Sequence, residues 1–320
     1  MRLVVAGGDV LEQILQESHG IWGDGLTLRG YRQYNLAQLR TPWGADRLCR
    51  YALLDERGTV LTSAKRYYLR ARVEGREVDA VGLGAVYTPE RQRGRGYAAS
   101  IVNRLVADAS ARGVELALLF SEIGTDYYER LGFVPVERRE LLMSVAEKAG
   151  APMALVRTGE ERDIPAVAAL AESISRHHRF AIGQSEDFIR FGLSRKRLLA
   201  GLLPPGSLTV EFFIVEEGTS AVAFAILTTA GDDVVLEMCA DRDATGARVG
   251  ALLQVLRART PSERALKMRG SLPPDWLPPQ LRIEASATPT DVLMVKPLGE
   301  GVLSRPLEHA DVLYWHGDLL

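Results

Sequence analysis

The stretch from Glu77 to Phe133 constrains the fold more than any other part of the chain. It begins with an apolar run that is rich in small residues, Val78 to Tyr87, which is typical of a buried strand. Pro89 ends this run, because proline cannot donate a hydrogen bond to a sheet. A basic, glycine-containing turn follows, and apolar residues then recur at helical spacing as far as Gly113. The pattern therefore predicts a strand, a glycine turn and a helix in direct succession.

The glycine turn, Arg91 to Ala98, precedes the amino end of the predicted helix. The first N–H groups of a helix have no intrahelical partner, and they carry the positive end of its dipole. Gly94 and Gly96 allow an anion to approach the backbone closely. The turn therefore predicts a phosphate cradle with arginines on its rim. A solvated run of charge is the alternative that a glycine-rich turn alone leaves open.

Two common nucleotide cradles are excluded by the sequence. The chain contains no G-x-x-x-x-G-K-[ST], so it has no P-loop. It also contains no G-x-G-x-x-G that opens a helix and is followed by an acidic residue at the required distance. A dinucleotide-binding fold is therefore not expected.

These residues resemble a known family. Arg91-Gln92-Arg93-Gly94-Arg95-Gly96 resembles the Q/R-x-x-G-x-G/A signature of the GNAT superfamily of N-acetyltransferases, and Tyr128-Glu129-Arg130-Leu131-Gly132-Phe133 resembles its Y-E-x-x-G-F ending. Val86-Tyr87-Thr88-Pro89 stands where the family has its cofactor-contacting strand. The glycine motif alone is moderately specific, whereas the two motifs in this order and context are specific together. The close match covers Glu77 to Val136.

The resemblance implies acetyl-CoA as cosubstrate and no metal. Backbone amides of the turn would bind the pyrophosphate, and the strand end would pair with the pantetheine at a splayed or bulged point. An amide at that point could polarise the thioester carbonyl. The implied cofactor-binding residues are Val86, Thr88, Arg93, Gly94, Arg95, Gly96, Tyr97, Ala98 and Ser121.

The resemblance also implies the residues that move protons. Tyr128 matches the family's usual general acid, with its hydroxyl near the sulfur. The alternatives are that Tyr128 is only a packed aromatic, or that neighbouring Tyr127 takes the role because the register differs by one. Glu122 is the nearest acidic candidate for the base, and a solvated surface glutamate is its ordinary alternative. The chain shows no Ser-His-Asp or Cys-His arrangement, so direct transfer without a covalent intermediate is favoured.

The acceptor is expected to bind before the organising stretch, where the family has its acceptor surface. Trp22, Tyr31 and Trp43 are the candidates, and for each tryptophan a lid over the core is the alternative. The implied acceptor is a primary amine of a small molecule, a peptide or a lysine side chain. Its identity, the acyl chain length and the oligomeric state are not fixed by the sequence. A non-catalytic acyl-CoA sensor or scaffold is the alternative function.

The 320 residues suggest two domains, at 1–148 and 149–320. We expect an α/β fold with a mixed, mostly antiparallel sheet flanked by helices, followed by a second GNAT-like domain. In the first half, Leu48 to Asp55 and Val60 to Leu69 predict a hairpin. Leu141-Leu142-Met143 predicts the last strand of the first domain, and Glu147 to Gly150 the linker.

The second half repeats the element order of the first. In place of the glycine turn it has Asp241-Arg242-Asp243-Ala244-Thr245-Gly246, and two carboxylates there would repel a pyrophosphate. It also has no counterpart of Y-E-x-x-G-F. We therefore expect a degenerate domain that binds no cofactor and shapes the acceptor pocket. Val292 to Val295 and Val312 to Trp315 predict closing strands, and the segment Val312 to Leu320 is a candidate to close the pocket.

Composition bounds the remaining possibilities. A formal net charge of −2 gives no reason to expect nucleic acid as a partner. Cys49 and Cys239 are far apart and lie in apolar runs, so they predict buried thiols in a reducing compartment. His177 and His178 lack further ligands at a workable spacing for a metal. No membrane-spanning stretch or signal peptide is recognised, which makes a cytoplasmic location the default expectation.

Overall fold

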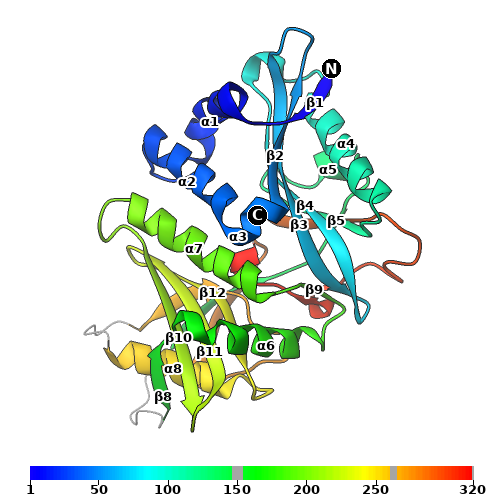
Figure 1. Cartoon of the computed structure of the whole chain (residues 1–320). Coiled ribbons are helices and arrows are strands. Elements are labelled where there is room, and N and C mark those ends of the chain that lie inside the picture. The colour runs from blue at the N-terminus through cyan, green and yellow to red at the C-terminus, as the bar shows by residue number, and fades with distance from the viewer. Residues whose placement is uncertain (146–153, 260–264, 319–320) are drawn as a thin grey trace. The chain divides into compact units, whose positions relative to one another are not determined.

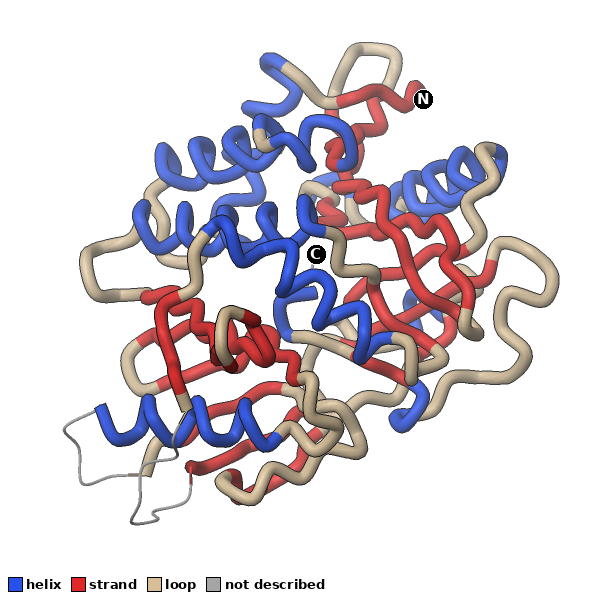
Figure 2. Tube along the Cα trace, turned by 60° about the horizontal axis from the view of Figure 1, so that its bottom comes forward, coloured by secondary structure: helices blue, strands red, loops and turns tan. Residues whose placement is uncertain are grey.

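The chain is described from a computed structural model that covers residues 1–145, 154–259 and 265–318 (Figure 1). It divides into two compact units, which we treat separately. Unit 1 comprises residues 1–136 and 290–306, and unit 2 comprises residues 137–289 and 307–318. Figure 2 shows strands and helices in both parts of the chain. Each unit contains a mixed sheet flanked by helices, so the predicted fold class is confirmed.

Unit 1 contains a sheet in the order β1-β2-β3-β4-β5-β15-β6. Its strands are β1 (Arg2–Val5), β2 (Leu48–Leu54), β3 (Val60–Val73), β4 (Arg76–Tyr87), β5 (Leu116–Ser121), β6 (Val134–Pro135) and β15 (Val292–Pro297). Its helices are α1 (Gly8–Trp22), α2 (Leu28–Arg40), α3 (Pro42–Arg47), η1 (Glu90–Gln92), α4 (Tyr97–Ala111) and α5 (Asp126–Glu129). All described pairs in this sheet are antiparallel except β4 and β5.

Helix α4 covers one face of this sheet. Ile101, Val102 and Leu105 are fully buried, and they belong to one hydrophobic cluster with Leu53 of β2 and Leu83 of β4. The helical spacing of these apolar residues is what the sequence predicted, because positions three and four apart share one face. The packing fixes the amino end of α4 relative to the end of β4.

Unit 2 contains a second sheet in the order β14-β7-β13-β12-β11-β10-β8. Its strands are β7 (Glu140–Val145), β8 (Leu155–Thr158), β9 (Phe180–Ile182), β10 (Thr209–Glu217), β11 (Ser220–Ala230), β12 (Asp233–Asp241), β13 (Lys267–Gly270), β14 (Leu281–Ala287) and β16 (Val312–Leu313). Its helices are η2 (Glu161–Asp163), α6 (Ile164–Ser175), α7 (Glu186–Leu202), α8 (Ala247–Arg259), η3 (His309–Asp311) and η4 (His316–Asp318). Strands β9 and β16 pair in parallel and lie outside this seven-stranded sheet.

The two sheets have the same pairing pattern. From β1 in unit 1 and from β8 in unit 2, three antiparallel pairs are followed by one parallel pair and then by an antiparallel strand. The parallel pairs are β4 with β5 and β12 with β13. In both units a helix follows the first strand of the parallel pair, α4 after β4 and α8 after β12. The predicted repetition of the fold is therefore present in the structure.

The strand beside each parallel pair comes from an unexpected part of the chain. Leu141-Leu142-Met143 was expected to end the first domain, but it lies in β7 and pairs with β13 and β14 of unit 2. The matching place beside β5 in unit 1 is taken by β15, which was expected to close the second half. The residues of a short apolar strand predict that it is buried but not which strand it pairs with, since strand pairing is non-local. The predicted linker and the boundary at 148 lie outside the described residues.

Candidate active site

Strands β4 and β5 pair over only part of their length. Their parallel register runs from Ala80↔Leu116 to Leu83↔Leu119. Beyond it β4 continues to Tyr87 and β5 to Ser121, with no further β4–β5 pair among the described residues. The end of β5 stays fixed by β15, since Ser121 pairs with Val292. The two strands therefore part, and backbone groups at the end of β4 are left without a strand partner on that side.

A bulge shapes β4 where the strands part. The register with β3 passes from Lys65↔Gly84 to Ser63↔Tyr87, so Ala85 and Val86 together oppose a single residue of β3. Ala85 has a φ of 45°, a left-handed conformation that is strained for a residue with a side chain. The resemblance implied a cofactor contact at a bulge near Val86, and the bulge is at that position. Contact with a cofactor stays a prediction.

Helix α4 begins without a capping side chain. Its N-cap is Gly96, with a φ of 75° and no side-chain hydrogen bond, and no acidic residue lies in the first turn. Gly94 is also left-handed, at 76°. A Cβ at either glycine would meet nothing within 4 Å, so the backbone conformation and not space demands glycine there. The amides of Tyr97 and Ala98 open the helix and so lack an intrahelical acceptor. This is the electropositive end that suits a phosphate.

The arginines of the turn have distinct partners. Arg91 donates to Glu17 of α1 at 2.9 Å, and Arg93 donates through Nε to the carbonyl of Thr88 at 3.2 Å. Arg95 lies within 3.4 Å of the Gln92 side chain. Arg91 and Arg93 thus tie the turn to α1 and to the end of β4, while the side chain of Arg93 remains half exposed at 55%.

Tyr128 is almost buried beside the end of the parallel pair. Its side chain is 8% exposed and belongs to the same hydrophobic cluster as Leu119 and Phe133. Burial raises the pKa of Tyr128 to about 12, and the charges of Tyr127 and Glu122 act in the same direction. The phenol therefore keeps its proton at neutral pH, which is the state a general acid requires.

Tyr127 faces a different part of unit 1. It is half-buried, its ring lies at 90° to that of Tyr128 with centroids 5.1 Å apart, and the Arg130 guanidinium lies 5.9 Å from the ring centroid. Burial raises its pKa, and Arg130 and a hydrogen bond with the backbone of Ala99 counteract this effect. Its hydroxyl is thus engaged at the first turn of α4. This placement distinguishes the two tyrosines, which the sequence alone left one residue apart.

Ser121 and Glu122 end β5 in different ways. Ser121 is buried, and its hydroxyl donates to the carbonyl of Gly124 at 2.5 Å, which closes the turn toward α5. Its oxygen keeps the capacity to accept a bond, but its proton is already used. Glu122 is exposed and close enough to affect the pKa of Tyr128. Neither observation assigns a catalytic role.

The three acceptor candidates lie in α1, α2 and α3. Trp22 is half-buried, and its ring lies edge-on to Tyr87, with centroids 6.3 Å apart, at the end of β4. Tyr31 is 3% exposed and shares a hydrogen bond of 3.2 Å with Ser18. Trp43 is 6% exposed. The structure thus brings Trp22 against the end of β4, and all three roles stay predictions.

Sequence reasoning missed a polar group on the face of the sheet opposite α4. Arg50 of β2 is buried, and Lys65 stands directly beside it on β3. The signal was present, because charged residues interrupt two apolar strands at positions that pair. Only the register of the hairpin shows that they meet.

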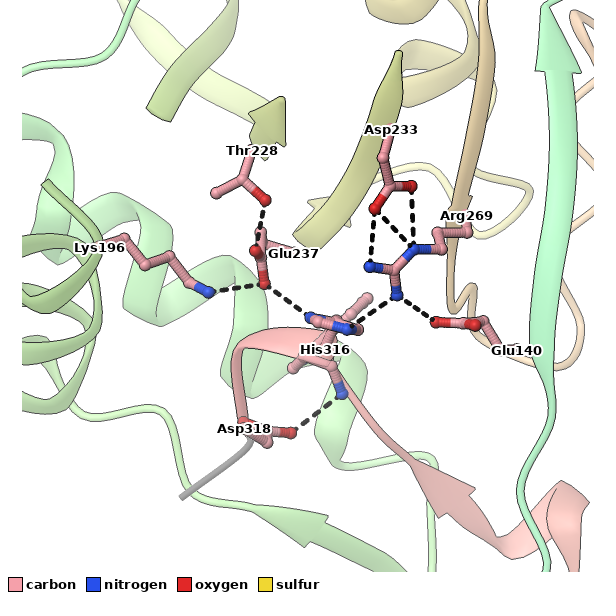
Figure 3. A network of polar contacts seen from close by, with 9 residues as sticks. Glu140, Lys196, Thr228, Asp233, Glu237, Arg269, His316 and Asp318 are labelled. Atoms are coloured by element: carbon pink, nitrogen blue, oxygen red, sulfur yellow. Dashed lines mark hydrogen bonds and ion pairs between the residues drawn. The ribbon is translucent and has the colours of Figure 1, made fainter. Parts of the chain in front are cut away.

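In unit 2 the corresponding positions are filled by the chain itself. Strands β12 and β13 pair only at Val235↔Arg269 and Leu236↔Gly270, and the next residue of β12, Glu237, is the bulged one. Its carboxylate is 3% exposed, yet it accepts hydrogen bonds from Thr228 at 2.6 Å and from Lys196 at 2.8 Å (Figure 3). The bulge of unit 2 therefore holds a bonded carboxylate.

The end of the chain crosses the parted strands of unit 2. His316 of η4 lies 3.1 Å from Glu237 of β12 and 3.2 Å from Arg269 of β13 (Figure 3). Arg269 also binds Asp233 and Glu140, at 3.0 and 3.3 Å. The segment that the sequence offered as a lid for the acceptor pocket thus bridges two strands of its own unit.

A carboxylate also occupies the amino end of α8. Asp241 is buried and accepts hydrogen bonds from the backbone N–H groups of Arg248 at 2.7 Å and Val249 at 3.1 Å. Asp243 instead bonds the hydroxyl and N–H of Thr245 in the turn. In unit 1 the matching helix end has no such cap. The expectation that aspartates disfavour a phosphate here gains a geometric reason, since Asp241 already takes the amides a phosphate would use.

Two further properties concern the described residues only. They contain no group of three or more His, Cys, Asp or Glu side chains that could hold a metal. None of the helices in the described ranges is long and apolar enough to cross a membrane.

Comparison with known proteins agrees with this geometry. The family model described as an acetyltransferase (GNAT) domain matches residues 33–136. Residues 33–136 form a GNAT acetyltransferase domain. Acyl transfer is the general activity that this domain supports, and an acyl-CoA is the cosubstrate type of its family. No curated protein sequence matches the chain.

Solved structures share the fold over nearly the whole chain. A probable N-acyltransferase from Enterococcus faecalis matches with a TM-score of 0.70 and 11% identity, covering 94% of this chain and 73% of that one. A GCN5-related N-acetyltransferase from Kribbella flavida matches with a TM-score of 0.67 and 16% identity, over 92% and 70%. Saccharomyces cerevisiae N-myristoyltransferase with bound myristoyl-CoA matches with a TM-score of 0.55 and 10% identity, over 92% and 83%. At these identities the likeness concerns the fold alone.

Proposed function

We propose that unit 1 transfers an acetyl group from acetyl-CoA directly to a primary amine. The observation that carries this proposal is the uncapped start of α4 next to the parted strands β4 and β5. It offers an anion site and a row of open backbone groups in one continuous stretch of chain. A CoA thioester presents a pyrophosphate, two amides and a carbonyl in the same order.

Binding would use the backbone more than side chains. The amides around Gly94 to Ala98 would accept the pyrophosphate, because they are open and at the positive end of the helix dipole. The edge of β4 at Val86 would pair with the pantetheine, since β5 has already diverged. At Thr88 the carbonyl accepts from Arg93, and the hydroxyl lies 3.0 Å from that of Thr62, which leaves the backbone N–H for a cofactor.

The transfer needs orientation and two proton movements. The amine nitrogen attacks the thioester carbonyl carbon, an N–C bond forms, and the C–S bond breaks. Tyr128 would give its proton to the departing thiolate, which its raised pKa allows because the phenol is fully protonated at neutral pH. The proton lost by the amine would pass to Glu122 or to water, and Tyr128 would then be reprotonated from solvent.

Unit 2 would bind no second cofactor. Asp241 already accepts from the first amides of α8, and His316 already bridges the strands β12 and β13. The proposal is therefore one acetyl-CoA per chain. The predicted role of the second half in shaping the acceptor pocket stays a prediction.

A thiol-release assay tests the proposal. Purified protein is incubated with acetyl-CoA and a panel of amines, free CoA thiol is measured, and the product is identified by mass spectrometry. We expect amine-dependent thiol release and an acetylated amine. Binding of acetyl-CoA without thiol release for any amine would instead favour a sensor or scaffold. If thiol is released faster from a longer acyl-CoA than from acetyl-CoA, the transferred group is that longer acyl chain and not acetyl.

A further inference from the structure

One buried guanidinium in unit 1 has two terminal nitrogens that lack a hydrogen-bond partner. Arg50 of β2 is 3% exposed, and neither of its terminal nitrogens has a hydrogen-bond partner among the described residues. A guanidinium keeps its charge in proteins and can only donate hydrogen bonds. An unpaired buried charge is strongly destabilising, so we expect a group that pairs with this guanidinium.

A neighbouring arginine shows that unit 1 can supply partners to the terminal nitrogens of a buried guanidinium. Arg66 of β3 is 4% exposed, and its two terminal nitrogens donate to Asp108 at 2.6 Å and to the hydroxyl of Tyr51. Arg66 pairs with Cys49 and Lys65 pairs with Arg50, so the two arginines point to opposite faces of the sheet. Both terminal nitrogens of Arg66 therefore have partners, whereas those of Arg50 have none.

The open guanidinium lies on the row that leads to the bulge. Arg50, Lys65 and Gly84 stand opposite one another across β2, β3 and β4. With strands about 4.8 Å apart, the Cα atoms of Arg50 and Gly84 are separated by roughly 10 Å. Gly84 is the first residue of β4 beyond its last pair with β5 and directly precedes the bulged Ala85. Arg50 is thus within the span of a small molecule from the proposed thioester position.

The face that carries Arg50 is the one opposite α4. Leu83 belongs to the cluster of α4, so its neighbours in sequence, Gly82 and Gly84, lie toward the other face and offer no side chain there. On that face Lys65 donates to Gln38 of α2 at 3.5 Å, and its charge acts on Asp24 in the loop before α2. The charge of Lys65 acts on an acidic neighbour, whereas the groups found to act on Arg50 among the described residues are the phenols of Tyr31 and Tyr67.

We propose that Arg50 binds a carboxylate of the acceptor, so that the acceptor is an amine that also carries a carboxylate. This inference rests on the proposed function and names its substrate class. The planar fork of arginine matches the two oxygens of a carboxylate, and a single negative charge balances Arg50 alone. Because both nitrogens are buried, a carboxylate can reach them only if helices α2 and α3, which contact β2, shift away from it.

The experiment compares Arg50→Met with the matched control Arg66→Met. Small amines of different length are used as probes, namely glycine, β-alanine and 4-aminobutyrate, each beside its own carboxamide. Thermal unfolding without CoA reports binding independently of catalysis. In the wild type we expect at least one carboxylate to raise the melting temperature and its carboxamide to leave it unchanged. Arg66→Met should keep this difference, and Arg50→Met should lose it.

Stability and turnover sharpen the comparison. Without ligand, Arg50→Met should melt no lower than the wild type, because it removes an unpaired buried charge. Arg66→Met should melt lower, because it removes the hydrogen bonds of Arg66 with Asp108 and with the Tyr51 hydroxyl. In the thiol-release assay, kcat/KM for the carboxylate-bearing amine should fall about 30-fold or more in Arg50→Met, with the thermal shift by acetyl-CoA unchanged. If Arg50→Met does not fold, the same measurements are made on Arg50→Lys, which keeps the positive charge and loses the two-pronged guanidinium that matches a carboxylate.

Failure of this inference can be told from failure of the proposed function. Equal binding or turnover of carboxylates and carboxamides in the wild type overturns the inference and leaves amine acetylation standing. A carboxylate preference that survives in Arg50→Met overturns it as well. A carboxylate-specific thermal shift that is lost in Arg50→Met, without thiol release for any amine, supports the site while refuting catalysis.

Discussion

His316 lies 3.1 Å from Glu237, with its Nδ1 against a carboxylate oxygen at the bulge of β12. Arg269 lies 3.2 Å from the other ring nitrogen and can only donate, so Nε2 accepts a hydrogen bond from Arg269. Nδ1 then carries the ring proton and donates a hydrogen bond to the Glu237 carboxylate. Through this ring the end of the chain joins two strands that are no longer paired with each other. Unit 2 has thus kept the parted strands of the fold and closed them with its own residues.

The first prediction is a binding stoichiometry of about one acetyl-CoA per chain. In unit 1 the start of α4 is uncapped, whereas Asp241 occupies the start of α8. Because a carboxylate and a pyrophosphate would compete for the same amides, the second site should stay empty. Titration calorimetry on the whole chain measures this number. A value near two would contradict it.

The second prediction concerns the glycine turn. Gly96→Asp places a negative side chain at the N-cap of α4, in the proposed phosphate path, so acetyl-CoA should no longer raise the melting temperature. Gly75→Asp is the matched control, because Gly75 is also left-handed, at 79°, but lies in the turn between β3 and β4. The control should lose similar stability and keep the shift. An unchanged shift in folded Gly96→Asp would remove the turn from the site.

The third prediction separates the two tyrosines. Tyr128→Phe removes the proposed proton donor and should lower kcat by about 10²-fold or more, with little change in acetyl-CoA affinity. Tyr127→Phe is the control, since its hydroxyl is engaged with the backbone of Ala99 in α4. Steady-state kinetics with a saturating amine measure both. If only Tyr127→Phe shows the loss in kcat, the register of the motif is off by one.

Local features of this chain were predictable because their causes are local. Gly94 and Gly96 predict left-handed backbone before a helix. The spacing of Ile101, Val102 and Leu105 predicts the buried face of α4. The hairpin of β2 and β3 followed from two apolar runs and a glycine turn.

Pairings between distant residues were not predictable. Strands β7 and β15 are both short and largely apolar, and nothing in their residues indicates which sheet each one joins. Glu237 and His316 are nearly eighty residues apart, so no spacing rule links them. Likewise the sequence shows Arg50 only as a single charged residue in a strand, and the register of β2 with β3 is needed to show that it lies beside Lys65.

The last prediction concerns the charge of Glu237. Burial alone would raise the pKa of Glu237, but its hydrogen bond with His316 and the charge of Lys196 lower it to about 2. Because the pKa is lower in the folded than in the unfolded chain, the unfolded chain binds more protons in acid. The contribution of the Glu237 charge to the stability of the folded chain is therefore complete above about pH 4.5 and is lost as the pH falls through about 2.

Glu237→Gln keeps the shape of the side chain and removes the charge that balances Lys196. At neutral pH the variant should lose about 3 to 5 kcal/mol of unfolding free energy, the usual cost of breaking a buried ion pair. The gap in melting temperature between wild type and variant should narrow as the pH falls from about 4.5 toward 2. Calorimetric scans across this range measure it, with Glu211→Gln on the exposed side of β10 as control. A gap that stays constant with pH would show that Glu237 stabilises unit 2 by its shape and not by its charge.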